Sequence, residues 1–403
     1  MKDKIGHFWI AAAEVTKGGR LYYAWVSLLL LVIAVGIYAY TIQARNGFIV
    51  TGLRDQNSWG FYISNFTFLV GVAAAAVLMV LPAYLYHFKP IKEIAFLGEM
   101  MAITAICMCI MFVMADVGHP ERVWHMLPFI GRPNFPTSML VWDVIVLNGY
   151  LVLNAVIFFY VLYKIYEGED YSSIIPLIII SIPWAVSIHT VTAFLYNGLT
   201  ARPFWNASVL APRFLASAFC SGPALMILVF QIVRRMTTTN VENSAILKMA
   251  ELIAYTMGVN IFLLGCEVFK EVYTDNVHLA PLTYLYVGLH GYSNLTPWIW
   301  LATAFNTASF FIFMLGRSMK GLTLINIACG MTIIGVYIEK GFGLIIPGFV
   351  PDPLGEIYEY VPTSVELMVA LGIWAAGALI YTLLIKFTLP IYSGKLRYKK
   401  SSY

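Results

Sequence analysis

Residues 137–163, TSMLVWDVIVLNGYLVLNAVIFFYVLY, decide the fold class of this chain. The stretch has 27 residues, of which only Asp143 is charged. At the ~1.5 Å rise per residue of an α-helix, it extends for about 40 Å, which is more than the ~30 Å hydrocarbon core of a bilayer. We therefore expect this segment to be a transmembrane helix.

Similar apolar stretches follow one another along all 403 residues. Hydrophobic residues make up 60% of the sequence and charged residues only 11%, against about a quarter in soluble domains. The net charge of +4 does not indicate nucleic-acid binding, because the basic residues are scattered between the apolar stretches. The sequence predicts an all-α polytopic membrane protein with about ten transmembrane helices. The predicted spans are 21–43, 58–86, 94–116, 137–163, 174–199, 208–233, 246–270, 295–316, 321–339 and 362–389.

The predicted topology follows from the basic residues between these spans. Ten spans place both termini on one side, and 17 of the 25 Lys and Arg residues fall on that side. Because cytoplasmic loops are enriched in Lys and Arg, we expect a multi-pass protein of the cytoplasmic membrane with both termini in the cytoplasm. The eight remaining basic residues, among them Arg213 and Lys340, are assigned to the outer side. The long connections 117–136, 271–294 and 340–361 then face outward.

The cysteines and histidines argue against a metal cofactor. None of the five cysteines forms a Cys-x-x-Cys pair, the usual sign of zinc or iron–sulfur ligation. Of the seven histidines, only His189 lies well inside a predicted span, whereas a transmembrane di-haem cytochrome needs four buried histidines. We expect the chain to carry no haem or iron–sulfur cluster of its own.

Polar groups inside the spans are costly in lipid and are therefore candidates for function. Asp143 lies about six residues from the outer end of its span and shares a helical face with Tyr150. His189 lies at a comparable depth on a face that also carries Thr192 and Tyr196. An isolated buried carboxylate costs several kcal/mol unless it is paired, hydrated or protonated, so Asp143 is a strong candidate.

Other polar groups have a structural alternative. The sequence DVGHPERVWHML, residues 116–127, brings Asp116, His119 and Arg122 to the outer end of the third span. Asp116 and Arg122 could instead form an interfacial ion pair that closes the helix end. The asparagines within the spans are expected to donate hydrogen bonds between helices. They are Asn148, Asn154 and Asn260.

A weak internal repeat predicts two related bundles. A shift of 152 or 153 residues aligns FYISNFTFLVG with FLASAFCSGPA and places Glu99 on Glu251 and Asp116 beside Glu267. Spans two to five and six to nine would then form two four-helix bundles, flanked by spans one and ten. The predicted parts are an interfacial segment 1–20, a first span and outer loop 21–57, the bundles 58–199 and 200–340, an outer loop and last span 341–389, and a basic cytoplasmic tail 390–403.

Five segments together resemble the polysulfide-reductase membrane-subunit (NrfD/PsrC) family. They are DVGHPERVWHML, SMLVWDVIVLNGYLVLN, SIHTVTAF, AELIAYTMGVNIFLLGCEVF and GEIYEYVPTSVELMVALGI. Within that family, the ten spans and the WDVIVLNGY stretch are most similar to the DsrP-type membrane subunit of Dsr complexes, which are linked to sulfite reduction and menaquinol. The resemblance implies two four-helix bundles, no metal of its own, and a quinone site near the outer surface in the first bundle.

The resemblance also implies roles for individual residues. Asp116, His119 and Arg122 match the family's Asp-x-Gly-Arg-Pro-x-Arg-like element, with His119 where Arg is common. Asp143 and His189 match polar positions associated with the quinone cavity and its proton path. In the second bundle, two carboxylates match proposed proton-relay positions. These carboxylates are Glu251 and Glu267.

The chemistry of quinol oxidation is compatible with these residues. It releases two electrons and two protons, and therefore needs an apolar slot, hydrogen-bonding groups and a titratable acceptor. Asp143, His119 and His189 are the predicted catalytic residues. Trp142 and Tyr150 are predicted to contact the quinone together with the outer Asp116, His119 and Arg122 group.

We expect a quinone-binding subunit that exchanges electrons between menaquinol and an outer-side ferredoxin-like iron–sulfur subunit. Other membrane and cytochrome subunits and lipid are the further expected partners. Two alternatives stay open: a secondary transporter or proton channel, and a cofactor-free membrane anchor for redox subunits. No span shows paired Gly/Pro interruptions at its midplane, which argues against a transporter.

Overall fold

The computed structural model describes residues 11–80, 82–83, 86, 88–127, 129–237, 239–275, 279–315 and 321–396. Over these ranges the chain forms α-helices and short 3-10 helices, joined by loops that carry isolated β-bridges. Ten of the described helical segments are long and apolar enough to cross a membrane. The prediction of an all-α polytopic membrane protein is therefore confirmed.

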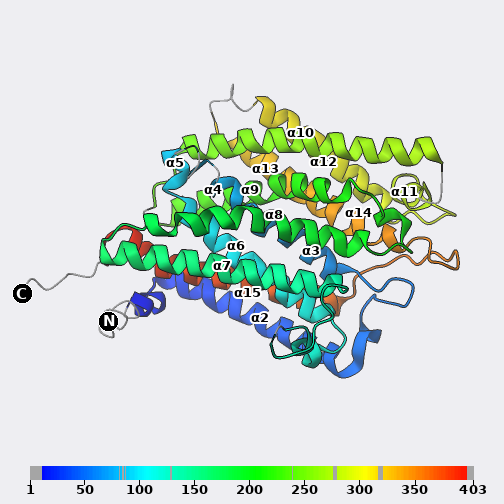
Figure 1. Cartoon of the computed structure of the whole chain (residues 1–403), viewed down its shortest axis with the longest axis horizontal. Helices are drawn as coiled ribbons and strands as arrows, with labels where there is room; N and C mark the ends of the chain where they lie inside the picture. The colour runs from blue at the N-terminus through cyan, green and yellow to red at the C-terminus, as the bar shows by residue number, and fades with distance from the viewer. Residues whose placement is uncertain are drawn as a thin grey trace, which may run out of the picture.

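The ten membrane-length segments lie side by side, with their axes along the long dimension of the molecule (Figure 1). Each overlaps the corresponding predicted span. They are α2 (Arg20–Asn46), α3 (Phe61–Ala74) with α4 (Val77–Val80), α6 (Ala95–Asp116), α7 (Met139–Glu167), α8 (Ile175–Asn197), α9 (Leu210–Met236), α10 (Asn243–Thr274), α12 (Thr296–Leu315), α13 (Thr323–Lys340) with α14 (Phe342–Ile345), and α15 (Ser364–Tyr392).

The helix contacts define two groups of four. In the first group, α3 packs on α6, α6 on α7, α7 on α8, and α8 on α3. In the second, α9 packs on α10, α10 on α12, α12 on α13, and α13 on α9. Helix α9 also packs on α3 and α8, which joins the two groups, while α2 packs on α15 at the flank of the first (Figure 1). The domain boundaries given above remain a prediction.

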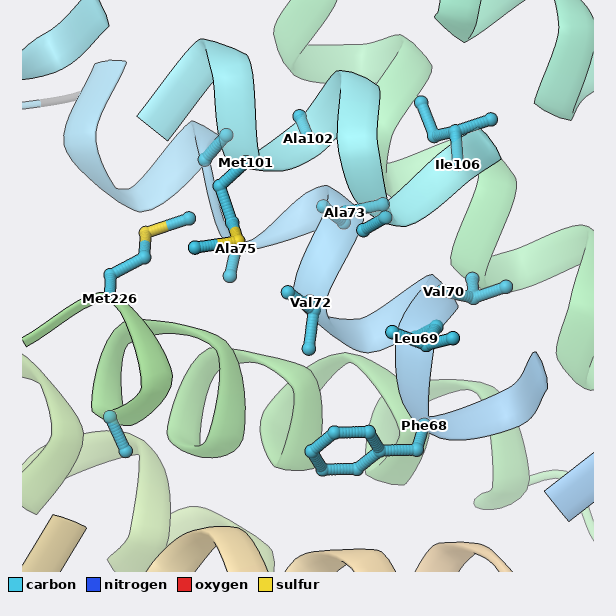
Figure 2. Close-up of a cluster of buried hydrophobic side chains, with 14 of the residues drawn as sticks. Phe68, Leu69, Val70, Val72, Ala73, Ala75, Met101, Ala102, Ile106 and Met226 are labelled. Atoms are coloured by element: carbon cyan, nitrogen blue, oxygen red, sulfur yellow. The ribbon is translucent and has the colours of Figure 1, made fainter. Parts of the chain in front are cut away.

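Helix α3 lies at the centre of the molecule. Its apolar window is fully buried, whereas only 17% of the window in α2 is buried. The helix carries no charge and only a few hydroxyl and amide side chains, so it is expected in such a position. Figure 2 shows α3 between α6, which carries Met101, Ala102 and Ile106, and α9, which carries Met226.

Small residues bring α3 and α9 into close contact. A Cβ atom added at Gly71 would lie 3.4 Å from the Cα of Ala218, and one added at Gly222 would lie 2.0 Å from the Cβ of Ala75. Residues 71 and 75 thus face residues 218 and 222, with small side chains four apart on both helices, which is a common way for helices to approach closely in membranes. The same device joins α2 to α15, where Gly36 faces Gly372.

We expect Gly222→Ala to destabilise the protein. The new methyl group would overlap Ala75, so α3 and α9 must separate, at a cost of about 1–3 kcal/mol. Gly330→Ala in α13 is the matched control, because no heavy atom lies within 4 Å of its added Cβ. This control should be neutral or more stable by up to ~1 kcal/mol, since alanine favours the helix. Unfolding by denaturant in lipid–detergent micelles measures both. Equal stability of the two variants would contradict the close contact.

Helix α3 is interrupted near one end, which the sequence did not predict. The helix ends at Ala74, a turn follows at Ala75 and Ala76, and α4 continues from Val77 to Val80. The predicted single span 58–86 is therefore too long as one helix. Residues 81, 84, 85 and 87 lie outside the described residues, as do 1–10 of the predicted interfacial segment and 397–403 of the predicted basic tail.

The two ends of the described chain meet at one end of the molecule. A 3-10 helix, η1 (Ala11–Thr16), precedes α2 and packs against α15, and the start of α2 and the end of α15 are drawn side by side (Figure 1). This arrangement fits an even number of crossings. The direction in which the protein sits in the membrane stays a prediction. We keep the term outer end for the end of the molecule opposite to η1.

A network at the outer end ties the last loop to the first. The Glu366 carboxylate, which caps the start of α15, accepts a hydrogen bond from the Gly52 amide at 2.7 Å and one from the Tyr360 hydroxyl. The Tyr360 oxygen accepts in turn from the amide of Phe61, at the start of α3, at 2.9 Å. Burial, and then the nearby Glu366 carboxylate, raise the pKa of the Tyr360 phenol. This network fixes the entrance of the central helix.

Candidate functional site

Asp143 and Thr192 form a buried polar contact in the first group of helices. Ser138 caps the start of α7, with its side chain accepting from the amide of Val141, and Asp143 follows in the second turn. The Asp143 carboxylate is 2% exposed, and its Oδ1 accepts a hydrogen bond of 2.8 Å from the hydroxyl of Thr192 on α8. Buried carboxylates need such partners, because desolvation without compensation is costly.

The face of α8 that carries Thr192 is polar along three helical turns. His189 and Tyr196 lie one turn to either side of it, and all three side chains are buried. The Tyr196 hydroxyl is 2.6 Å from the hydroxyl of Thr67 on the central helix α3. The Nδ1 atom of His189 is buried and has no hydrogen-bond partner among the described residues. His189, Thr192 and Tyr196 share one face of α8, as their spacing predicts, and the structure buries that face.

The outer loop before α7 holds the predicted headgroup residues at the surface. His119 and Arg122 have 66% and 69% of their side chains exposed, at the start of η4 (Pro120–Met126). Both approach Glu121, at 2.9 Å from His119 Nδ1 and 4.0 Å from Arg122 Nε. A backbone hydrogen bond and then the hydrogen bond from His119 hold the pKa of the Glu121 carboxyl below its usual value.

The alternative of an Asp116–Arg122 ion pair is wrong. Arg122 approaches Glu121 instead, and Asp116 at the end of α6 has a buried Oδ1 without a hydrogen-bond partner among the described residues. Next to Asp116, the Gln43 side chain from α2 donates to the carbonyl of Ala115 at 2.7 Å and accepts from the Tyr62 hydroxyl at 2.6 Å. The unsatisfied Asp116 oxygen leaves a hydrogen-bond acceptor at the outer end of the first group.

Trp142 and Tyr150 lie in different surroundings. The Trp142 ring packs against Phe135, with ring centroids 4.5 Å apart, and its Nε1 donates to the carbonyl of Pro136 at 2.8 Å. It therefore anchors the outer loop to α7. Tyr150 is 1% exposed and belongs to the main hydrophobic core. Neither side chain has a hydrogen bond to Asp143 in the described part of the chain.

The asparagines divide into two kinds. Asn148 and Asn154 donate to carbonyls of their own helix, Val144 and Tyr150, both at 2.8 Å, so the expected bonds between helices are wrong for these two. Asn260 on α10 does reach another helix, where its Nδ2 is 3.4 Å from Glu339 on α13. Its contact belongs to a larger group of charged residues.

A buried charged cluster lies in the second group of helices. The Arg213 guanidinium on α9 donates to Glu267 on α10 and, at 2.8 Å, to Glu339 on α13. All three side chains are at most 8% exposed. Asn306 on α12 donates to the second oxygen of Glu339 at 2.7 Å. The cluster therefore connects all four helices of this group.

Arg213 and Lys340, counted above with the outer-side basic residues, are buried, and the side of the membrane to which they belong stays a prediction. Arg213 is 6% exposed and Lys340 is 3% exposed, because both point into the protein from the ends of their helices. The Lys340 Nζ has no hydrogen-bond partner among the described residues and lies 4.9 Å from the centroid of the Phe214 ring. A count of charges by sequence position cannot tell a flanking residue from an inward one. The sequence did contain a signal for the inward position of Arg213. This arginine lies within a predicted span, and two other predicted spans carry the acidic residues Glu267 and Glu339.

Glu251 and Glu267 are not joined by any hydrogen bond in the described residues. Glu251 lies near the start of α10, within 3.3 Å of Lys248 Nζ, and accepts from Tyr255 at 3.1 Å. Glu267 lies sixteen residues further along the same helix, about 24 Å away at the helical rise. The proton path predicted through both carboxylates stays a prediction.

Two small cavities adjoin the polar groups. One has a volume of about 10 Å³ and lies between the two groups of helices, with His189 and Lys340 among its lining residues. The other has a similar volume and is lined by Arg213, Glu267 and Glu339 among others. Each has about the space that a single water molecule needs. Neither of these two cavities has room for a quinone ring.

The described residues contain no group of three or more His, Cys, Asp or Glu side chains that could hold a metal ion. The prediction that the chain has no metal centre stays a prediction.

The described residues form ten membrane-length helices with charged groups buried between them, which defines a polytopic integral membrane protein.

The chain belongs to the polysulphide reductase NrfD family, whose profile matches residues 49–351. It is 25% identical to a putative dimethyl sulfoxide reductase membrane subunit of Halobacterium salinarum, with 90% of each chain covered. It is 24% identical to the Hdr-like menaquinol oxidoreductase integral membrane subunit of Archaeoglobus fulgidus, covering 91% of this chain and 92% of the relative. A selenate reductase subunit of Mesobacillus selenatarsenatis is 22% identical, with 93% of this chain and 95% of the relative covered.

Proposed function

We propose that this protein is the quinone-binding membrane subunit of a respiratory oxidoreductase complex. It exchanges electrons between menaquinol and an iron–sulfur partner of the ferredoxin type that docks at the outer end. The family and the named relatives, which are subunits of reductases and of a menaquinol oxidoreductase, support this class of function. The Dsr-type subgroup, the cytoplasmic membrane and the cytoplasmic location of both termini are parts of the same proposal.

The buried Asp143 carboxylate is the observation that carries the proposal. Oxidation of a quinol releases two protons for every two electrons, so the protein needs an acceptor within reach of the outer end. Asp143 lies in the second turn of α7, and in the described part of the chain its side-chain hydrogen bond to Thr192 uses Oδ1. Its other oxygen is then available to take a proton. The polar face of α8 with His189 continues inward from this point.

The residues of the outer end would bind and orient the quinol. Asp116 Oδ1 has no hydrogen-bond partner among the described residues, so we assign it as the acceptor for one quinol hydroxyl, which must displace the side chains that bury this oxygen. Arg122 and His119, exposed on η4, can donate to the oxygen on the other side of the ring. When quinol is bound, its oxidation supplies the electrons and protons. Electrons leave outward to the partner, and Asp143 takes a proton inward.

Bound quinone and iron in the purified complex test this function. We expect menaquinone and an iron–sulfur partner to co-purify with the chain. Replacing His119 or Arg122 by Ala should weaken quinone binding roughly two- to tenfold, the effect of losing about 0.5–1.5 kcal/mol per hydrogen bond. His125→Ala is the matched control, since His125 is exposed on the same 3-10 helix and packs on Trp124 instead.

The other two functions give different results in the same experiment. Iron without quinone would favour a cofactor-free anchor for redox subunits. A chain that purifies without iron and without quinone would favour a transporter or proton channel, to be followed by flux assays in vesicles. Equal quinone binding in His119→Ala, Arg122→Ala and His125→Ala would place the quinone site elsewhere.

A further inference from the structure

The cavity between the two groups of helices brings together side chains from four helices. Thr67 comes from α3, His189 from α8, Ser217 and Ser221 from α9, and Lys340 from α13. Its volume of about 10 Å³ is close to the space of one water molecule, and five of its ten lining residues carry a hydroxyl or nitrogen group. A cavity with several polar partners holds water, whereas an apolar one of this size stays empty.

Both basic side chains at this cavity carry a nitrogen without a well-formed hydrogen bond, although the His189 ring interacts with the Ala185 backbone and Lys340 with the Phe214 ring. The Nδ1 of His189 and the Nζ of Lys340 are buried atoms without a hydrogen bond among the described residues. Leaving a buried donor unsatisfied costs about 1–3 kcal/mol, so such groups in a native protein usually bind an internal water. A single water in the cavity can serve both atoms, since water donates and accepts at the same time.

The charged residues near Lys340 have opposite signs. The neighbouring cluster contains one guanidinium, Arg213, and two carboxylates, Glu267 and Glu339, joined by ion pairs. With a neutral amine at Lys340 this group has a net charge of −1, and with an ammonium it is neutral. By formal charge alone, a proton at Lys340 would balance the cluster, while the positive Arg213 in the same cluster opposes it.

We propose that a water molecule in this cavity links His189 to Lys340 and forms a proton-exchange junction between the two groups of helices. His189 as imidazolium gives its ring proton to the water, and the water passes one of its own protons to the neutral Lys340 amine. His189 ends as neutral imidazole, Lys340 as ammonium, the water is regenerated, and no electron moves. The inference rests on the proposed function only for the source of the proton, which is quinol by way of Asp143.

Nitrogen NMR of the protein in lipid bilayers tests the junction without any quinol. With ¹⁵N-labelled lysine, the resonance that disappears in Lys340→Met belongs to Lys340. We expect this resonance to show a cross-peak to water protons and to shift in His189→Gln. A Lys340 resonance that has no water cross-peak, or that does not move in His189→Gln, overturns the proposal.

Ser217→Val gives a second test, in case Lys340→Met fails to fold. The substitution replaces the hydroxyl by one methyl group and adds a second, which makes the cavity smaller and less polar while His189 and Lys340 are retained, so the water cross-peak of one lysine should be lost. Ser181→Val is the matched control, because Ser181 is also buried and also donates to a carbonyl three residues earlier, yet does not line the cavity. Loss of the cross-peak in both variants, or in neither, contradicts the junction.

The proposed function and the junction can fail separately. A wild-type complex without bound quinone would overturn the function and leave the NMR result intact. Normal quinone binding together with a Lys340 that does not contact water would overturn the junction alone.

Discussion

Arg213→Met is expected to give the largest loss of stability in this protein. Removing the guanidinium leaves Glu267 and Glu339 buried with no arginine between them, and breaking a buried ion pair on one side costs about 3–5 kcal/mol. Because the cluster connects α9, α10 and α13, the loss should loosen the whole second group of helices. Denaturant unfolding in micelles and the yield of monodisperse protein after size-exclusion chromatography measure the effect.

Restoring the charge balance separates electrostatics from packing. The triple variant Arg213→Met, Glu267→Gln, Glu339→Gln removes both carboxylate charges, and we expect it to regain most of the stability lost in Arg213→Met. Arg213→Lys should lie between the two, because a lysine keeps the charge but cannot donate to two carboxylates in the same planar geometry. If Arg213→Met unfolds at the same denaturant concentration as the wild type, the cluster does not stabilise the fold.

Asp143→Asn is expected to cause the largest loss of activity. A general base contributes about 10²–10⁴-fold to a proton-transfer step, so quinol oxidation by the assembled complex should slow by a factor in this range. Stability should change little, because the amide oxygen of an asparagine can still accept the hydrogen bond from Thr192. Steady-state oxidation of a soluble menaquinol analogue, measured with the complex in lipid nanodiscs, gives the rate.

Asp170→Asn is the matched control for this variant. Asp170 is an exposed aspartate in the connection between α7 and α8, at the opposite end of α7 from Asp143. The complex with Asp170→Asn should oxidise quinol at the wild-type rate. An Asp143→Asn complex that assembles normally, binds quinone and turns over like the Asp170→Asn complex would remove Asp143 from the mechanism.

The sequence predicted the fold well because the membrane leaves few choices. A long apolar stretch in hydrocarbon has to satisfy its backbone hydrogen bonds internally, so it forms a helix whatever its neighbours are. All ten predicted spans therefore reappear as membrane-length segments. The boundary that failed, at the end of span 58–86, lies where α3 is interrupted at Ala75 and Ala76, and two alanines give no local signal for a turn.

The candidate site could be predicted only in part. Asp143, His189 and the face of α8 were identified because a polar group within an apolar helix is conspicuous by itself. The partner of Asp143, Thr192, lies 49 residues away on another helix, and an ordinary threonine does not reveal this role. His119 and Arg122 were expected at the outer end with Asp116, and the structure has both exposed beside Glu121, whereas one Asp116 oxygen is buried.

The sequence by itself determined that the chain is a bundle of membrane helices with ionisable groups inside it. Only the tertiary structure decided which of these groups meet. One cluster joins Arg213, Glu267 and Glu339, which come from three helices. Glu267 lies 54 residues and Glu339 lies 126 residues after Arg213 in the sequence. Lys340 and His189 meet at one cavity. The physical reason is that the hydropathy of each segment determines whether it forms a membrane helix. Ion pairs depend instead on how the helices rotate and pack against each other.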